Sequence, residues 1–416
     1  MTPVPATADR TQQPAGLRAF VALVAALMAT NALAIDSMLP ALPEIGEALG
    51  IAEANERQWI ITAYLLGFGG AQIVFGPLAD RFGRRPVLLA GLAVYALASL
   101  AAAAATSFEA MMVARVVQGI GAAGSRVLAV TIVRDRFAGR QMARIMSLAF
   151  IVFLAVPILA PSIGQLIILV APWRWIFLAL GLFGALVALW AGRSLPESLA
   201  PENRRPIAIG SVLAAFAACL SQRVPLGYMT AMTFMIGGLF GFINAAQQIF
   251  VDVFHAPEWF TLVFAAIAAF MALAAFLNAR IVERYGMRRV SHTALMGYVA
   301  LTLVHAGLAL AGRETIWVFA LFQGASMFCF GLMVSNFGAM AMDPLGRIAG
   351  TASSVQGFVT TVGGAAIGFF IGQQFNGTAT PTVLGFAACG LAALAMVLVA
   401  ERGRLFRPQQ SATVRP

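Results

Sequence analysis

One loop of the chain reads Gly76-Pro77-Leu78-Ala79-Asp80-Arg81-Phe82-Gly83-Arg84-Arg85-Pro86 and separates two long apolar stretches. A shorter version of it, Glu283-Arg284-Tyr285-Gly286, stands 203 positions later (283 − 80). The pair Gln118-Gly119 is likewise repeated as Gln323-Gly324, 205 positions later (323 − 118). Two matches at nearly the same offset predict a chain built from two related halves. In transporters with internal repeats, the substrate site lies where the halves meet, near the middle of the bilayer.

The composition excludes a water-soluble protein. Of the 416 residues, 60% are hydrophobic and only 11% are charged, and the mean hydropathy is +0.86. Such a chain needs lipid as its solvent. Apolar segments of about 20 residues, the length that crosses a bilayer core, lie at 17–40, 56–78, 86–106, 109–133, 143–170, 172–193, 226–251, 258–280, 290–312, 314–338, 347–374 and 377–401. We therefore predict an all-α membrane protein of twelve transmembrane helices in two pseudo-symmetric six-helix bundles.

The distribution of arginine predicts the orientation of these helices. All 27 basic residues are arginine, and with both termini inside, 22 of them fall on the cytoplasmic side and three, Arg57, Arg174 and Arg313, outside. The remaining two, Arg115 and Arg126, lie within a predicted helix. Because short cytoplasmic loops collect basic residues, we expect both termini to be cytoplasmic. This topology also accounts for the net charge of +10 without a nucleic-acid partner.

A polar stretch from Arg193 to Pro206 divides the chain near its middle. We expect a cytoplasmic tail at 1–16, a six-helix bundle at 17–193, a linker with an interfacial helix at 194–225, a second bundle at 226–401 and a cytoplasmic tail at 402–416. The run Ala32-Leu33-Ala34 also imitates a signal-peptide cleavage site. Cleavage there would leave an odd number of helices and would misplace every later arginine loop, so we favour a retained first helix.

Two charged residues, Asp36 and Arg115, stand inside membrane-length apolar segments. Each costs roughly 2.5–3.5 kcal/mol on insertion scales, so such residues are kept for pairing or for moving ions and substrates. At ~1.5 Å per residue their predicted depths differ by only about 3 Å, and we expect them to lie side by side. The pair can couple proton exchange to transport, or it can be a static ion pair. The position that matches Arg115 in the second half is Ala320, so the fold alone does not demand the arginine.

The loop at 76–86 resembles the signature of the major facilitator superfamily. In that family the aspartate and the arginine four residues on, here Asp80 and Arg84, form a charge network with an acidic residue at the inner end of helix 4, here Asp135, and we include Arg81 in it. The resemblance implies that this network holds the outward-facing state. Incidental pairing within an arginine-rich loop is the alternative.

Three further segments resemble one branch of this superfamily, the twelve-helix drug:proton antiporters. The segment Arg115-Val116-Val117-Gln118-Gly119 resembles the helix 4 signature of proton-driven members, and residues 35–43 around Asp36 resemble the helix 1 signature. Pro157, Pro161 and Gly164 match part of the helix 5 antiporter signature, although a simple helix kink explains them equally well. The segments 173–177 and 195–198 bring the chain nearest to bicyclomycin and chloramphenicol exporters.

The resemblance implies a bacterial inner-membrane protein that exports small amphipathic compounds against protons and so confers antibiotic resistance. The alternative is a proton-coupled exporter of one metabolite, such as an amino acid or a sugar. We expect no enzymatic activity, because no catalytic cluster lies at membrane depth, and no cofactor besides the proton gradient. The three histidines, His255, His292 and His305, lack the spacing of a metal site. The expected partners are a small-molecule substrate, protons and the bilayer, and we expect a monomer.

Candidate substrate contacts are the polar, aromatic and flexible side chains on helices predicted to face the central space. They are Met28, Asn31, Tyr64, Gln118, Arg126, Phe240, Asn244, Gln247, Asn336 and Gln356. An apolar lining with a few amides suits diverse amphipathic molecules, whereas ordinary helix packing explains any one of them alone. Arg126 follows Arg115 by eleven residues, which returns to nearly the same helix face. It either lines the space or extends toward the inner membrane surface.

Overall fold

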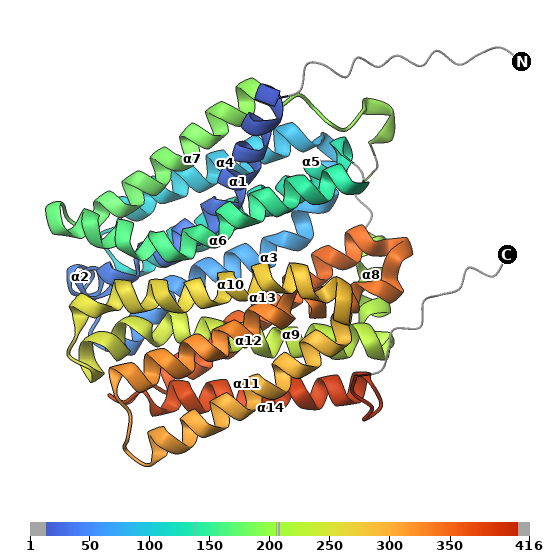
Figure 1. The fold of residues 1–416 in the computed structure, drawn as a ribbon. Coiled ribbons are helices and arrows are strands. Elements are labelled where there is room, and N and C mark those ends of the chain that lie inside the picture. Colours follow the sequence, from blue (N-terminus) through green and yellow to red (C-terminus); the bar gives the residue numbers. More distant parts are fainter. Residues whose placement is uncertain (1–13, 138, 205, 207–208, 407–416) are drawn as a thin grey trace, which may run out of the picture.

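The structure is a computed structural model that describes residues 14–406 except 138, 205, 207 and 208 (Figure 1). These residues contain no strand. The long helices are α1 Pro14–Asp36, α3 Trp59–Phe82, α4 Arg84–Ala103, α5 Phe108–Arg136, α6 Gly139–Val170, α7 Arg174–Ser194, α9 Arg223–Gln248, α10 Phe260–Tyr285, α11 Met287–Leu310, α12 Ile316–Met342, α13 Ala349–Gln373 and α14 Thr380–Ala400. Two shorter helices are α2 Leu42–Ala48 and α8 Ile209–Ser221. A π-helical turn, Ile249–Val253, extends α9.

The predicted membrane segments correspond to these long helices. In the described residues, eleven helical segments are long and apolar enough to cross a membrane by length and composition. The twelfth predicted segment corresponds to α6, which is 32 residues long and contains the apolar stretch Ala155–Val170. The all-helical fold of eleven to twelve spans is therefore confirmed.

The two halves repeat one packing pattern. In the first half, helices α1 to α7, the contacting pairs are α1 with α6, α3 with α5, α4 with α5 and α4 with α7. In the second half, helices α9 to α14, they are α9 with α13, α10 with α12, α11 with α12 and α11 with α14. The halves meet along two crossings, α3 against α13 and α6 against α10. These crossings are equivalent, because α3 corresponds to α10 and α6 to α13. The fold therefore has the twofold organisation that the loop motifs predict.

Glycine begins the third long helix of each half. Gly83, which precedes α4, has φ of 101°, and Gly286, which precedes α11, has φ of 81°. Residues with a Cβ avoid this left-handed region, so both loops require glycine for the sharp turn between helices. The repeated loop motif thus encodes a backbone conformation as well as charge.

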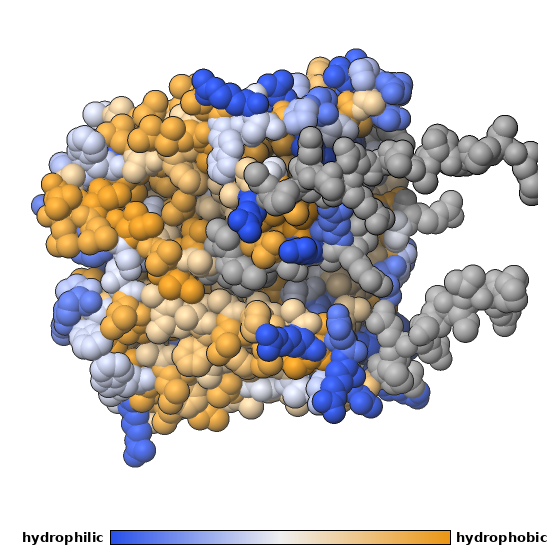
Figure 2. Space-filling model, turned by 45° about the horizontal axis from the view of Figure 1, so that its top comes forward, coloured by the Kyte–Doolittle hydropathy of each residue, from blue (hydrophilic) through white to orange (hydrophobic). Residues whose placement is uncertain are grey.

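The described ends of the chain, Pro14 and Phe406, lie at the same end of the helical bundle (Figure 1). We call it the arginine-rich end, because the loops after α3, α5, α7 and α10 also lie there with most of the arginines. The loops with Arg57, Arg174 and Arg313 lie at the other end, the arginine-poor end. Figure 2 shows a hydrophobic belt across the molecule, with hydrophilic residues gathered toward the arginine-rich end.

The predicted interfacial helix corresponds to α8, and residues 207 and 208 just before it lie outside the described part. Ala215 and Cys219 are buried on the side of α8 that packs against the bundle, where α13 and α9 lie. Leu213 and Leu220 remain exposed on the other sides. This distribution suits a helix on a membrane surface, which stays a prediction, as do the domain boundaries.

Candidate functional site

Arg115, on α5, is fully buried and binds the backbone of two other helices. Its Nε donates to the carbonyl oxygen of Ile60 on α3 at 2.9 Å, and its Nη2 donates to that of Ala34 on α1 at 3.1 Å. Its Nη1 donates to the Oε1 of Gln118 at 2.6 Å. The guanidinium carbon also lies 4.5 Å from the centre of the Tyr64 ring, within the range of a cation–π contact. Arg115 therefore joins three helices of the first half.

Asp36 is the last residue of α1 and is 4% exposed. It makes no hydrogen bond or ion pair with any residue that the structure describes, and the expected ion pair with Arg115 is absent. The reason is helix geometry: Ala34, which faces Arg115, and Asp36 are about 200° apart around α1 at 100° per residue. The prediction of similar depth was sound, but the prediction of contact was wrong.

The carboxylate of Asp36 is not fully sealed. Some buried polar side-chain atoms have neither a hydrogen-bond partner nor any exposed surface, and the two carboxylate oxygens of Asp36 do not belong to this group. Both oxygens therefore keep a small exposed surface. A carboxylate with such surface and with no fixed cation can gain and lose a proton as its surroundings change.

A closed polar core surrounds Arg115 within the first half. Gln118 Nε2 donates to the Ser99 hydroxyl at 2.7 Å, and the Tyr64 hydroxyl donates to Asn31 Oδ1 at 2.9 Å. Gln118, Tyr64 and Ser99 are fully buried. Gln118 and Tyr64 therefore do not line a substrate pocket in this structure, because the buried arginine requires them as partners. Ser99 was missed because a lone serine in an apolar segment gives no signal in the sequence.

Gly164, on α6, lies directly against the segment that follows Asp36. A Cβ on Gly164 would overlap the carbonyl oxygen of Ser37, so no other residue permits this approach. Helix α6 continues through Pro157 and Pro161. Gly164 thus allows α6 to pack against the backbone just after the end of α1.

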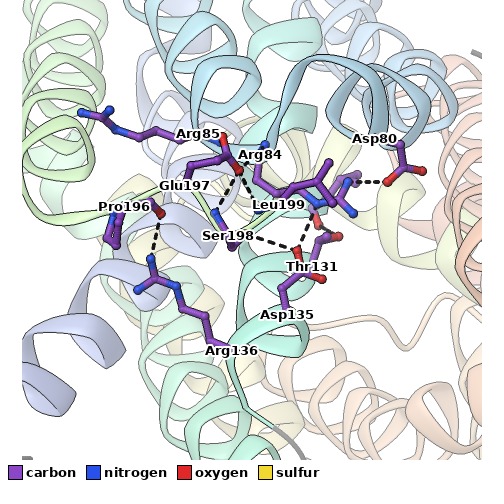
Figure 3. A network of polar contacts seen from close by, with 11 residues as sticks. Asp80, Arg84, Arg85, Thr131, Asp135, Arg136, Pro196, Glu197, Ser198 and Leu199 are labelled. Carbon is purple, nitrogen blue, oxygen red and sulfur yellow. Dashed lines mark hydrogen bonds and ion pairs between the residues drawn. The ribbon is translucent and has the colours of Figure 1, made fainter. Parts of the chain in front are cut away.

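The charge network expected at the arginine-rich end is formed (Figure 3). Arg84 Nη1 lies 2.5 Å from Asp80 Oδ1, and Arg84 Nε lies 3.1 Å from Asp135 Oδ2. The Arg84 side chain is 8% exposed, whereas that of Asp80 is 48% exposed. Arg81 is exposed and makes no contact of this kind in the described chain, so its inclusion was wrong. One residue further along α3 than Asp80, it points about 100° away.

Glu197, in the linker after α7, completes this network. Its carboxylate accepts hydrogen bonds from the backbone N–H groups of Arg84 at 2.9 Å, Arg85 at 3.1 Å, Ser198 at 2.9 Å and Leu199 at 3.0 Å. Burial raises the pKa of Glu197, but these four donors outweigh it and hold the pKa below its ordinary value. Glu197 therefore fixes the start of α4 to the linker. Its negative charge also suits a helix N-terminus.

The second half has an equivalent acid, 204 positions later (401 − 197). Glu401 follows α14 and accepts hydrogen bonds from Arg288 Nε at 2.8 Å and from the Tyr228 hydroxyl at 2.7 Å. His292 Nε2 lies 2.9 Å from the same hydroxyl. In both halves, an acid beyond the last helix therefore holds the start of the third long helix, α4 or α11. This cluster was missed because its members are scattered along the sequence.

The halves are joined at the arginine-poor end by an amide clasp, which we define as Asn55, Gln58, Gln248 and Gln373. Gln58 Nε2 donates to Gln248 Oε1 at 2.7 Å, and Gln248 Nε2 donates to Asn55 Oδ1 at 2.8 Å. Gln373 Nε2 donates to the backbone oxygen of Asn55 at 2.8 Å. Asn55 and Gln58 belong to the first half and the other two to the second. The clasp therefore closes this end in the structure.

The remaining pocket candidates occupy different surroundings. Asn336 and Asn278 exchange hydrogen bonds of 2.9 and 3.2 Å inside the second half, so Asn336 is a packing residue here. Gln356 contacts the backbone oxygen of Gly338 at 3.4 Å. Both side-chain amide atoms of Asn244 are buried without a partner. The other candidates are partly or fully buried: Met28, Asn31, Phe240 and Gln247.

Arg126 is the exception among the candidates, because it is exposed. It makes no hydrogen bond, ion pair or ring contact with any described residue. In the same described residues, no group of three or more His, Cys, Asp or Glu side chains could hold a metal ion.

Comparison with known proteins gives consistent results. Residues 21–368 match the sequence profile of the Major Facilitator Superfamily. A bicyclomycin resistance protein homolog of Haemophilus influenzae is 30% identical over 85% of this chain and 89% of its own length. A chloramphenicol resistance protein of Pseudomonas aeruginosa is 32% identical over 85% of this chain and 82% of its own. The xylose transporter XylE of E. coli, in a partially occluded inward open conformation, has the same fold, with a TM-score of 0.72 at 12% identity over 92% of this chain and 98% of its own.

Proposed function

Because the chain belongs to the major facilitator superfamily, we propose that it is a proton-coupled transporter that exports small amphipathic compounds by alternating access. The observation that carries this proposal is Asp36: a buried carboxylate in a membrane-length helix, without a fixed cation, whose oxygens keep a small exposed surface. Charged residues at this depth mark ion and proton pathways in membrane proteins.

The packing of the halves supports alternating access. Only α3 with α13 and α6 with α10 form the main contacts between the halves among the described residues, so rocking about these crossings can open either end. The amide clasp closes the arginine-poor end. Since basic loops are cytoplasmic, we assign the arginine-rich end to the cytoplasm and the structure to an inward-facing state. The charge network of Arg84 is then free to engage the second half in the other state.

The names of two relatives suggest the cargo. These relatives are resistance proteins for bicyclomycin and chloramphenicol, and we propose antibiotics and similar compounds as substrates here. No described group suggests catalysis. A panel that also contains amino acids and sugars tests the narrower role of a metabolite exporter.

Reconstituted vesicles provide the test. The wild-type protein is expected to move chloramphenicol or bicyclomycin against its gradient when a pH gradient is imposed. Asp36→Asn is expected to abolish this response, and the control Asp252→Asn, which changes an exposed acid at the arginine-poor end, is expected to keep it. Full gradient-driven transport by Asp36→Asn would refute the coupling role.

A further inference from the structure

Arg126 is a permanent positive charge with no counter-ion in the described structure. The arginine side chain stays protonated in proteins, and leaving a charge unpaired inside a membrane protein is costly. Asp80 and Asp135, the acids at the inner ends of α3 and α5, are held by Arg84. Asp36 lies near Arg115 in depth, eleven residues or ~16 Å along α5 from Arg126. The part of the chain that the structure describes therefore supplies no anion for this guanidinium.

The position of Arg126 along α5 rules out simple extension to the membrane surface. Helix α5 ends at Arg136, ten residues or ~15 Å beyond Arg126. Side chains of a helix also lean toward its N-terminus, which for α5 is the arginine-poor end. Both facts set the guanidinium back from the arginine-rich end of α5 by ~15 Å or more.

The exposed face of Arg126 points to the second half. Arg126, Val130 and Arg134 follow one another at intervals of four residues and are all exposed, so they form one stripe on α5. At the end of this stripe, Arg134 Nη1 lies 3.7 Å from where a Cβ of Gly350, on α13, would stand. The lipid-facing residues Val113 and Val117 lie roughly 140–180° away from Arg126 around the helix. The stripe therefore reaches α13 of the second half at its arginine-rich end.

The neighbours of Arg126 leave its guanidinium uncovered. Ala122, Ala123 and Ala129, one turn before and after it, are small and fully buried. Arg126 is itself exposed, and since the amide clasp closes the arginine-poor end, we infer that a ligand approaches it from the arginine-rich end. A planar guanidinium in such a position can donate two parallel hydrogen bonds to an oxyanion.

We propose that Arg126 is the anion-recognising residue of the transport path, so that the preferred cargo is an amphipathic molecule with a carboxylate. This inference rests on the proposed transport function and adds to it a preference for anions over neutral compounds of similar shape. The cargo carboxylate supplies the missing counter-charge, and its apolar body lies against the largely apolar helices around it. Cations of the same shape are repelled by the same charge.

The test is equilibrium binding to the purified full-length protein in nanodiscs, with matched pairs of ligands. The pairs are dansylglycine and dansylglycinamide, 2-naphthoate and 2-naphthamide, and biphenyl-4-carboxylate and its amide. In at least one pair the carboxylate is expected to bind at least about tenfold more tightly, because one charge-assisted contact is lost in the amide. Arg126→Gln is expected to remove this preference, and Arg126→Lys to retain part of it.

Two controls separate this inference from the proposed function. Arg280→Gln removes an arginine that stacks on Phe276 of α10, and it is expected to leave the preference unchanged. Asp36→Asn is also expected to keep it, because the assay contains no proton gradient. A preference that survives in Arg126→Gln, or that is absent from all three pairs in the wild type, overturns the assignment, whatever the result for proton coupling.

Discussion

Arg115 donates a hydrogen bond from Nη2 to the carbonyl oxygen of Ala34, two residues before Asp36 on the same helix, at 3.1 Å. The two buried charges therefore lie at similar depth without neutralising each other. Arg115 is fixed by three hydrogen bonds, whereas Asp36 has no partner in the described structure. The first is suited to hold helices together and the second to change its protonation.

This difference predicts that substituting Arg115 destabilises the protein strongly, whereas substituting Asp36 destabilises it little. Arg115→Ala breaks bonds to α1, α3 and Gln118, and each hydrogen bond to a charged group contributes about 1.5–3 kcal/mol. We expect a loss of at least ~3 kcal/mol, seen as a large drop in the thermal unfolding midpoint in detergent. Asp36→Asn breaks no contact and should shift the midpoint little, although it abolishes coupling. Equal destabilisation by both variants would contradict these separate roles.

Gly164→Ala is expected to impair transport without blocking membrane insertion. The new Cβ overlaps the Ser37 carbonyl oxygen, and overpacking of this kind costs typically 1–3 kcal/mol. It should also displace the backbone next to Asp36. Transport rates are compared with Gly192→Ala, whose Cβ meets nothing closer than 3.7 Å. Similar rates for the two variants would show that the close approach of α6 is unimportant.

Asp80→Asn should slow transport more than it destabilises the protein. The half-exposed Asp80 contacts only Arg84, so an exposed pair of this kind contributes about 0–1 kcal/mol. Asp135→Asn should destabilise more, because Asp135 accepts hydrogen bonds from both Arg84 and Ser198. Unfolding midpoints and turnover numbers measured on both variants check this order. The reverse order of stabilities would argue against the geometry of the network.

Glu197 should stabilise the protein at neutral pH and lose this effect in acid. Its folded pKa lies below the ordinary value of 4.5, so the folded state favours the ionised form. The contribution is present above about pH 4.5 and is lost as the pH falls through the folded pKa. The difference in unfolding midpoint between wild type and Glu197→Gln should therefore shrink below about pH 4.5. A difference that is constant with pH would mean that the backbone donors do not act on the charge.

Removing the amide clasp should open the arginine-poor end. Gln58→Ala removes the hydrogen bonds that the Gln58 side chain makes between the halves. Each such bond contributes about 0.5–1.5 kcal/mol, which is enough to shift the populations of the two states several-fold. Spin labels at Glu53→Cys and Asn376→Cys, in a background with Cys219, Cys329 and Cys389 replaced by serine, report the distance between the halves. Ser107→Ala, at the N-cap of α5, serves as a control. An unchanged distance distribution in Gln58→Ala would exclude the clasp as a gate.

Much of the fold follows from periodicity and hydropathy. The predicted segment 86–106 corresponds to α4, Arg84–Ala103, and the segment 314–338 to α12, Ile316–Met342. The short helix α2 lies just beyond the first predicted segment, 17–40, and was missed because its seven residues are far fewer than a membrane span needs. A hydropathy profile indicates how long an apolar segment is, but it carries little information about where the helix bends.

The site was predicted less completely, because sequence gives depth more readily than direction. The contacts of Arg84 with Asp80 and Asp135 follow from a motif of fixed spacing. The relation of Asp36 to Arg115 depends on which face of α1 meets α5, and this is set by packing. The amide clasp joins residues about 190 to 318 positions apart. Neutral amides give no charge or hydropathy signal, so nothing in the sequence marks them as partners.

The clasp consists entirely of uncharged groups. Moving one elementary charge through the membrane field changes the energy by ≈ 2.3 kcal/mol per 100 mV, but parting these four amides moves none. They also do not titrate between pH 4 and 9. Breaking the clasp therefore costs the same in an energised cell as in a depolarised one, and in acid as in neutral medium. Voltage and external acidity can reach the transport cycle only through its ionisable side chains and its charged cargo.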